Sequence, residues 1–315
     1  EWNRRQRQMC IRDSVAGREL AAAGAEVALV DKGRSVGGRL ATRRIGGATL
    51  DHGAQFFTVR TPAFRRQVDD WTARGLVRVW SQGFDDDDGH PRYVATGGMN
   101  SLAKDLAGPL QVETSTMAFA VRPSRESTGW EVVIDDGTTR PADAVIVTCP
   151  LPQTFALLVD AGIDLDDPRF RIDYDRTLAL LAVLDAAPAI PAPGGVQLGS
   201  DTVFSFIGDN VSKGVSAVPA VTFHASPEWS LAHWGDDPDS VHTALLDAAG
   251  PWLGDASVVE SHLKRWRFAR PRDVHPDPCI TLHGGSVVVG GDAFAGPRVE
   301  GAHNSGLACA HALLG

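Results

Sequence analysis

The sequence has 315 residues, of which 43% are hydrophobic and 22% are charged, enough for a packed core in one large or two interlocked domains. Its formal net charge of −9 argues against general nucleic-acid binding, because that function needs a basic face to neutralise phosphates. No apolar run is long enough to span a membrane and no secretory signal is found, so we expect no membrane partner. The four cysteines are far apart and form no C-x-x-C pair, which argues against a disulfide framework or a zinc site and favours the cytoplasm.

Residues 4–14 read R-R-Q-R-Q-M-C-I-R-D-S, which matches, residue for residue, the translation of a common transposase sequencing adapter. A natural basic arm would be the alternative, but eleven consecutive matches make coincidence negligible. We therefore expect residues 1–14 to be a sequencing scar, and not a targeting signal or a nucleic-acid tail.

Residues 15–31 predict a helix, a turn at Gly24 and an apolar strand that ends in Asp31. In a Rossmann βαβ unit an acid at this place binds the ribose of an adenosine, and a G-x-G-x-x-G loop precedes the helix. Counting back from Gly24 and Asp31, the glycines of that loop should fall near positions 8, 10 and 13. Those positions hold Gln8, Cys10 and Asp13. We infer that the scar displaced the glycine loop and that this chain binds its dinucleotide weakly.

Residues 32–42, directly after this strand, read K-G-R-S-V-G-G-R-L-A-T. The pair Gly37–Gly38 lets backbone amides approach a pyrophosphate, which Arg34 and Arg39 can neutralise. Residues 46–57 then read G-G-A-T-L-D-H-G-A-Q-F-F, a short strand that runs into D-H-G-A-Q. On physical grounds alone this second segment is equally a strand end with a turn glycine.

In the middle of the chain the predicted elements alternate between strands and helices. In chain order they are a helix over 61–75, a strand over 77–80, a strand leading into a helix over 93–107, and strands near 111–122, 130–135 and 143–148. They continue with a helix after 151, strands over 177–184, 203–207 and 220–224, and a helix over 238–249. The acidic run 85–88, with His90 beyond it, predicts a solvated turn and no metal site, because adjacent carboxylates cannot all converge on one ion.

The end of the chain provides a second cofactor signal. Residues 286–292 read S-V-V-V-G-G-D, a strand that ends in Asp292, and residues 298–313 predict a helix with small residues on one face. The Asp292 carboxylate is well placed to hold a ribityl hydroxyl, and the amides of Gly301 and Ala302 would point at the flavin edge where charge accumulates on reduction. By itself this segment is an ordinary buried strand and helix, but together with the N-terminal motif it indicates FAD.

These segments together resemble the renalase-like bacterial FAD-dependent oxidoreductases of the amine oxidase superfamily. The resemblance extends to F-S-F-I-G-D-N-V-S-K, F-H-A-S-P-E-W-S and R-W-R-F-A-R-P, in order along the chain. It implies noncovalent FAD, with D-x-G-A-Q beside the isoalloxazine ring. It also implies hydride transfer from a reduced, isomeric nicotinamide dinucleotide or similar donor, with O₂ as the acceptor and H₂O₂ as the product. The predicted cofactor-binding residues are Asp31, Lys32, Arg34, Gly37, Gly38, Arg39, Thr42, Gly53, Ala54, Gln55, Gly291, Asp292, Arg298, Val299, Glu300, Gly301 and Ala302.

The expected fold class is α/β. A Rossmann-type FAD-binding domain, p-hydroxybenzoate-hydroxylase-like by resemblance, carries an inserted α+β substrate domain on a mostly antiparallel sheet. The FAD motifs lie at both ends of the chain, so this domain must be discontinuous. We expect it to comprise residues 15–61, 93–150 and 266–315, with residues 62–92 and 151–265 in the substrate domain.

The candidate catalytic residues are Asn210, His224 and Arg298. A structural histidine and a turn asparagine are the alternatives for the first two, and a rim salt bridge is the alternative for Arg298. Arg298 also disfavours an amine oxidase, because a cation before the last helix would repel an ammonium substrate. The cluster Arg265–Phe268 suits a nicotinamide phosphate, although a packed strand edge explains it equally well. A non-catalytic or FAD-deficient remnant is the alternative of another class.

Overall fold

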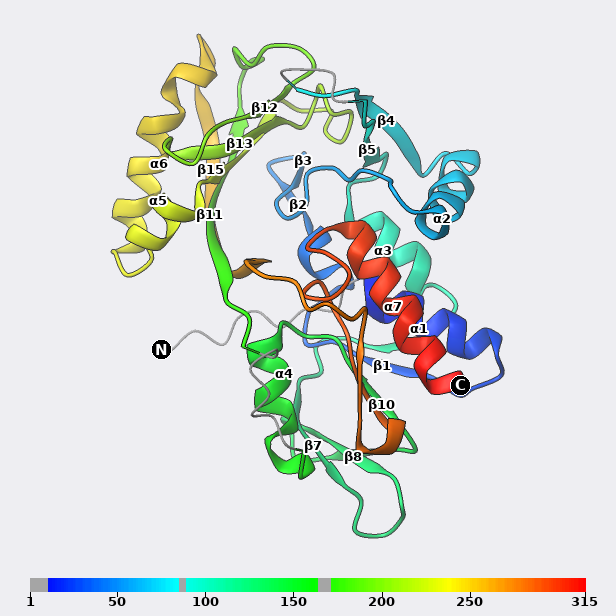
Figure 1. Cartoon of the computed structure of the whole chain (residues 1–315). Coiled ribbons are helices and arrows are strands. Elements are labelled where there is room, and N and C mark those ends of the chain that lie inside the picture. The colour runs from blue at the N-terminus through cyan, green and yellow to red at the C-terminus, as the bar shows by residue number, and fades with distance from the viewer. Residues whose placement is uncertain (1–10, 85–88, 164–170) are drawn as a thin grey trace. The chain divides into compact units, whose positions relative to one another are not determined.

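The computed structural model describes residues 11–84, 89–163 and 171–315 (Figure 1). Contacts between Cα atoms divide the chain into two units. Unit 1 comprises Glu1–Arg39, Leu102–Asp173 and Pro271–Gly315, and unit 2 comprises Leu40–Ser101 and Tyr174–Arg270. Each unit is therefore built from segments that are far apart in the sequence.

Unit 1 contains short parallel strand pairs of the Rossmann kind. β1 (Ala28–Val30) pairs in parallel with β6 (Gln111–Glu113), and β10 (Val145–Val147) pairs in parallel with β17 (Val287–Val289). β16 (Ile280–Leu282) joins the other edge of β17 in the antiparallel sense. All three valines of β17 are buried, as expected for β-branched residues in a central parallel strand.

Two helices of unit 1 pack closely on each other. α1 (Ile11–Ala22) contacts α7 (Val299–Leu314), and they share a core with Val288. Gly306 permits this approach, because a Cβ there would lie 2.6 Å from the carbonyl oxygen of Arg12. The remaining elements of unit 1 are most of α3 (Asn100–Ala107), the antiparallel strands β7 (Ala118–Pro123), β8 (Trp130–Ile134) and β9 (Thr139–Ala142), and α4 (Leu151–Leu158), which packs against β7.

Unit 2 is organised around a five-stranded antiparallel sheet. Its strand order is β12 (Gly195–Gln197), β13 (Phe204–Asp209), β14 (Ala220–Ala225), β11 (Tyr174–Leu184) and β15 (Val258–Pro271). α6 (Pro238–Leu253) packs one face on this sheet through Val241, Leu245, Ala249 and Leu253. These residues repeat every four positions and therefore lie on one side of the helix.

β11 is apolar on both faces because both faces are covered. Leu178, Leu180, Ala182 and Leu184 belong to the core beneath α6. Leu181 and Val183 point the other way, into a core with the hairpin of β2 (Thr42–Ile45) and β3 (Ala48–Asp51). Residues 178–184 of this strand therefore form a continuous apolar run with no alternation.

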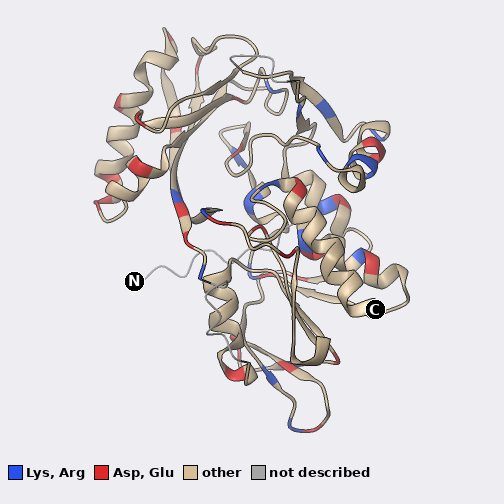
Figure 2. Ribbon diagram, in the orientation of Figure 1, with Lys and Arg blue, Asp and Glu red and all other residues tan. Residues whose placement is uncertain are grey.

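The other elements of unit 2 are α2 (Pro62–Ala73), β4 (Val77–Ser81), β5 (Arg92–Ala95) and α5 (Pro227–Ala232). The Thr61 hydroxyl caps α2 by accepting a hydrogen bond from the amide of Phe64. α2 carries charges of both signs, whereas the charged residues of α6 are all acidic (Figure 2).

The expected α/β class with a mostly antiparallel second sheet is confirmed, and so are the expected helices over 61–75, 238–249 and 298–313. The short elements β2, β9, β12, β16 and α5 were not expected from the sequence, and neither was the length of β15. The acidic run 85–88 lies outside the described residues.

The expected domain boundaries differ from the two units. Residues 40–61 and 93–101 belong to unit 2, because the β2–β3 hairpin buries its apolar side chains against β11 and β14. Residues 151–173 belong to unit 1, where α4 packs against β7. The expected boundary between residues 265 and 266 falls inside the continuous strand β15.

We predict opposite effects for two glycine-to-alanine changes inside helices. A Cβ at Gly301 would overlap the carbonyl oxygen of Gly296, so Gly301→Ala should lower the free energy of unfolding by about 2 kcal/mol. At Gly250 in α6 nothing lies within 4 Å of the new Cβ, so Gly250→Ala should raise it by about 0.5–1 kcal/mol. Urea unfolding followed by circular dichroism measures both, and equal effects of the two changes would contradict the packing described at Gly301.

Candidate active site

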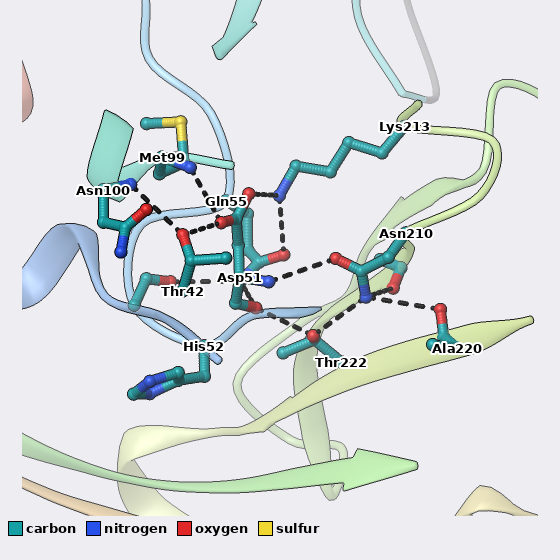
Figure 3. Close-up of polar contacts among 12 residues, drawn as sticks. Thr42, Asp51, His52, Gln55, Met99, Asn100, Asn210, Lys213, Ala220 and Thr222 are labelled. Atoms are coloured by element: carbon teal, nitrogen blue, oxygen red, sulfur yellow. Dashed lines mark hydrogen bonds and ion pairs between the residues drawn. The ribbon is translucent and has the colours of Figure 1, made fainter. Parts of the chain in front are cut away.

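The polar centre of unit 2 is the buried carboxylate of Asp51, at the end of β3 (Figure 3). It accepts hydrogen bonds from the Thr42 hydroxyl at 2.6 Å and from the Met99 amide at 2.8 Å. Its second oxygen lies 2.8 Å from the ammonium of Lys213. Both charged side chains of this ion pair are fully buried, so each depends on the other for neutralisation.

Lys213 lies in the turn after β13, where its amide donates to the carbonyl oxygen of Asp209. Its ammonium also donates to Gln55 Oε1 at 3.2 Å. Burial lowers the pKa of the Lys213 ammonium below its ordinary value, and the Asp51 carboxylate acts in the opposite direction. Gln55 Nε2 in turn donates to the carbonyl oxygens of Asp51, at 2.7 Å, and Gly53, at 3.1 Å. The ion pair therefore fixes the D-H-G-A-Q segment through the Gln55 side chain.

Asn210 is a fully buried hub beside this pair. Its Nδ2 donates to the Thr222 hydroxyl at 3.1 Å and, at longer range, to the carbonyl oxygens of Gly208 and Ala220. Its Oδ1 accepts from the Asp51 amide at 3.3 Å, and the Thr222 hydroxyl donates to the Asp51 carbonyl oxygen at 2.8 Å. The side-chain amide of Asn210 is therefore engaged within the chain, which favours a positioning role over direct chemistry.

An uncharged aromatic cluster begins at the next residue, His52. The His52 ring stacks on Trp266 of β15, with 5.4 Å between ring centroids, and the Trp266 indole donates to the His52 carbonyl oxygen at 2.8 Å. His224 of β14 reaches the same oxygen through Nε2 at 3.2 Å. Burial, helped by Lys264, His224 and Arg43, lowers the pKa of His52 to about 3. Burial likewise lowers the pKa of His224 to about 4, with Lys213 acting in the same direction. Both rings are neutral at pH 7.

Unit 1 has a separate charged cluster at Asp292, just after β17. Its carboxylate pairs with the Arg39 guanidinium and, at 3.2 Å, with Nη1 of Arg12. Burial alone would raise the pKa of Asp292, but Arg39 and Arg12 hold it below its ordinary value. At the end of β1, Asp31 is buried and accepts the Gly33 amide at 2.7 Å. Arg12, which lies in the expected scar, is thus an ordered and buried part of unit 1.

The structure divides the predicted site residues between the two units. Unit 1 contains Asp31, Lys32, Arg34, Gly37, Gly38, Arg39, Gly291, Asp292, Arg298, Val299, Glu300, Gly301 and Ala302. Unit 2 contains Thr42, Gly53, Ala54, Gln55, Asn210 and His224. In unit 1, Arg39 and Asp292 are brought together, and in unit 2, Asn210 and Gln55 both contact Asp51. Arg34 and Arg298 are exposed, and Arg298 forms no ion pair with any residue that the structure describes.

The sequence analysis did not select Asp51, Lys213 or Trp266 as site residues. Asp51 and Trp266 stand inside motifs that were noticed, D-H-G-A-Q and R-W-R-F. Lys213 ends the segment D-N-V-S-K, but nothing local distinguishes it from an exposed lysine. Its burial depends on a contact across 162 positions of the chain, between residues 51 and 213.

The neutral histidines predict a loss of stability on acidification. The unfolded chain binds a proton at His224 more tightly, with the ordinary pKa of 6.5, than the folded chain does. The stability contributed by His224 is therefore complete above pH 6.5 and is lost as the pH falls toward about 4. Between pH 7 and pH 5 the expected loss is roughly 2 kcal/mol. Urea unfolding should show this dependence reduced in His224→Asn, and identical pH dependence in the two proteins would contradict it.

No helix among the described residues combines the length and the apolar character needed to cross a membrane. Two family profiles match consecutive parts of the chain. One, described as an NAD(P)-binding Rossmann-like domain, matches residues 14–71. The other, described as a flavin containing amine oxidoreductase, matches residues 72–171.

The chain is also similar to individual proteins along most of its length. It is 24% identical to renalase from Mus musculus over 303 residues, which cover 89% of this chain and 88% of that protein. It superposes on a protein described as a protoporphyrinogen oxidase from Exiguobacterium sp. 255-15 with a TM-score of 0.72 and 13% identity, over 96% of each chain. It superposes on putrescine oxidase bound to putrescine with a TM-score of 0.71 and 14% identity, over 98% of this chain and 97% of that one. At such identities the solved structures establish the fold. The flavin containing amine oxidoreductase profile and the similarity to renalase support an oxidoreductase whose cofactor is FAD.

Proposed function

We propose that the protein oxidises a reduced nicotinamide dinucleotide, in an isomeric form, or a similar hydride donor, and passes the electrons to O₂ with release of H₂O₂. The observation that carries this proposal is the neutralised carboxylate of unit 2. An amine substrate binds as an ammonium ion, which needs an available anion or an open aromatic face. Asp51 is buried and paired with Lys213, so it offers no free charge.

The aromatic cluster supports the same choice of substrate. His52 stacks on the Trp266 ring, and the Lys264 ammonium lies 5.2 Å from the centre of that ring. Lys264 and Arg43 act on His52 as positive charges, whereas the charge of Lys213 is compensated by Asp51. Such surroundings disfavour a cation and suit an uncharged ring attached to phosphates.

We propose that the FAD-binding residues of unit 1 are those predicted from the sequence. Gly37 and Gly38 have φ values of 128° and 52°, conformations that glycine adopts readily and that allow backbone amides to approach a phosphate. Asp31 and Asp292 are buried carboxylates suited to ribose and ribityl hydroxyls. When bound, FAD supplies the hydride acceptor. The same role for Thr42 and for Gly53, Ala54 and Gln55 of unit 2 stays a prediction.

One segment of this chain does not fit the cofactor. Arg12 lies where a glycine loop is expected to approach the dinucleotide, and its guanidinium pairs with Asp292. Asp13 accepts a hydrogen bond from the Thr148 hydroxyl and adds a negative charge at one expected glycine position. We propose that Arg12 competes with FAD for Asp292, so that this chain binds FAD weakly.

Removal of this competition should increase FAD affinity. For the variant Arg12→Ala/Asp13→Ala we expect a dissociation constant about tenfold lower, equivalent to about 1.4 kcal/mol. The quenching of flavin fluorescence on titration measures it without any turnover. Arg18→Ala/Glu19→Ala on the same helix α1 makes the same change of charge away from Asp292 and is the matched control. If both variants changed the dissociation constant for FAD equally, or if neither variant changed it, the proposed competition would be contradicted.

Three residues have proposed parts in the reaction. His224 contacts the substrate, and Asn210 positions the Asp51 backbone through its side-chain amide. Arg298, exposed at the start of α7, supplies positive charge for the reduced flavin or for an anionic part of the substrate. Hydride transfer from a dihydropyridine needs little acid–base assistance, so binding and orientation are the main tasks of these side chains.

Anaerobic reduction of the flavin tests the proposed function. The FAD-loaded protein should lose its flavin absorbance when isomeric NAD(P)H is added and should keep it when primary or secondary amines are added. Readmission of O₂ should restore the absorbance and produce H₂O₂. Bleaching by amines alone would overturn the proposal in favour of an amine oxidase, and absence of bound flavin in the Arg12→Ala/Asp13→Ala variant would favour a non-catalytic remnant.

A further inference from the structure

The carbonyl oxygen of His52 receives two aromatic side chains from different strands. Trp266 Nε1 of β15 lies 2.8 Å from it, and His224 Nε2 of β14 lies 3.2 Å from it. A carbonyl oxygen only accepts hydrogen bonds, so both nitrogens must donate. The hydrogen on His224 is therefore on Nε2.

The hydrogen bond from His224 Nε2 determines whether the other ring nitrogen, Nδ1, is a hydrogen-bond donor or an acceptor. Because burial keeps the ring neutral, it carries one hydrogen, and that hydrogen is on Nε2. Nδ1 is thus a bare hydrogen-bond acceptor. No hydrogen bond reaches Nδ1 from the residues that the structure describes, and the atom is not sealed from solvent. His224 is partly buried, so Nδ1 is open to a ligand.

A second unsatisfied atom lies in the same cluster. Nδ1 of His52 is buried and has no hydrogen-bond partner among the described residues. Buried polar atoms without partners are uncommon in folded proteins and mark places where water or a ligand completes the site. The stack of His52 on Trp266 holds this ring in place.

We propose that His224 is a specificity-determining residue whose Nδ1 accepts a hydrogen bond from an uncharged N–H or O–H group of the substrate, and that Trp266 is the positioning residue that maintains this tautomer. The identity of the substrate rests on the proposed function. The further proposal names the substrate group that donates to Nδ1 of His224. In a reduced nicotinamide that group is the carboxamide N–H₂. An ammonium donor is disfavoured, because Lys264 and Arg43 place positive charge near His52.

Trp266 acts through the backbone of His52. Its indole N–H and the His224 N–H share one oxygen, so Trp266 helps to hold that oxygen beside the His224 ring. Trp266→Phe keeps an aromatic ring to stack on His52 and removes the N–H. We expect the His52 carbonyl to shift and the His224 ring to populate both tautomers.

The first test is nitrogen NMR of ¹⁵N-histidine-labelled protein loaded with FAD, which distinguishes a protonated ring nitrogen from a bare one. The wild-type protein should show His224 with hydrogen on Nε2 only, and Trp266→Phe should show a mixture. Trp130→Phe is the matched control, because it removes an indole hydrogen bond of 3.1 Å to Ser286 in unit 1. Hydrogen on Nδ1 of His224 in the wild-type protein would overturn the proposal, as would an unchanged tautomer in folded Trp266→Phe.

The second test uses two isosteric substitutions. In His224→Asn the amide oxygen can take the place of Nδ1, whereas in His224→Gln the amide reaches the place of Nε2. We expect KM for isomeric NAD(P)H to rise about tenfold in His224→Gln and no more than about threefold in His224→Asn, with smaller changes in kcat. The opposite order would overturn the proposal.

Failure of this inference and failure of the proposed function give different results. If no reduced dinucleotide bleaches the flavin, the proposed function fails, while the tautomer of His224 is still read by NMR. The acceptor role is then measured with nicotinamide as an unreactive probe, which should perturb the Nδ1 resonance of His224. No perturbation by nicotinamide or by the reduced dinucleotide would overturn the acceptor role.

Discussion

The ion pair between Asp51 and Lys213 is the constraint on which the rest of unit 2 depends. Both charges are out of contact with water, and removing one partner would leave the other buried without compensation, at a cost of about 3–5 kcal/mol. The pair also joins segments that have no neighbours in sequence. The carboxylate of Asp51 binds Thr42 of β2 and the amide before α3, its carbonyl oxygen binds Thr222 of β14, and Lys213 brings the turn after β13. These contacts of Asp51 and Lys213 together fix the position of the D-H-G-A-Q segment.

The ion pair between Asp51 and Lys213 also affects the charges around the cluster at His52. Because Asp51 and Lys213 compensate each other, the positive charges left near His52 are those of Lys264 and Arg43, and burial keeps both rings uncharged. The result is a site of donors, acceptors and aromatic faces in which Asp51 is not free to bind a cationic substrate. The proposed selectivity rests on which ring nitrogens carry hydrogen and not on net charge.

In unit 1 the ratio of cations to carboxylates at Asp292 differs from that at Asp51. Two arginines pair with one carboxylate there, whereas Asp51 pairs with a single lysine. One of these arginines belongs to the segment expected to be a scar. Helix packing holds it in place, because α1 approaches α7 over Gly306 and buries the Arg12 side chain. A residue of that segment thus pairs with the carboxylate that we propose for the cofactor.

The sequence by itself determined the fold class, the cofactor and the order of most elements. These follow from local signals: the apolar periodicity of α6, the apolar run of β11, the threonine cap of α2, and the acids and glycine pairs that follow β1 and β17. The tertiary structure alone decided the partition into units, because the β2–β3 hairpin belongs with whichever sheet buries Ile45 and Leu50. It also decided the roles of Lys213, Trp266 and Arg12. Each acts through one contact with a residue more than a hundred positions away, and the free energy of such a contact leaves no periodic pattern in the chain.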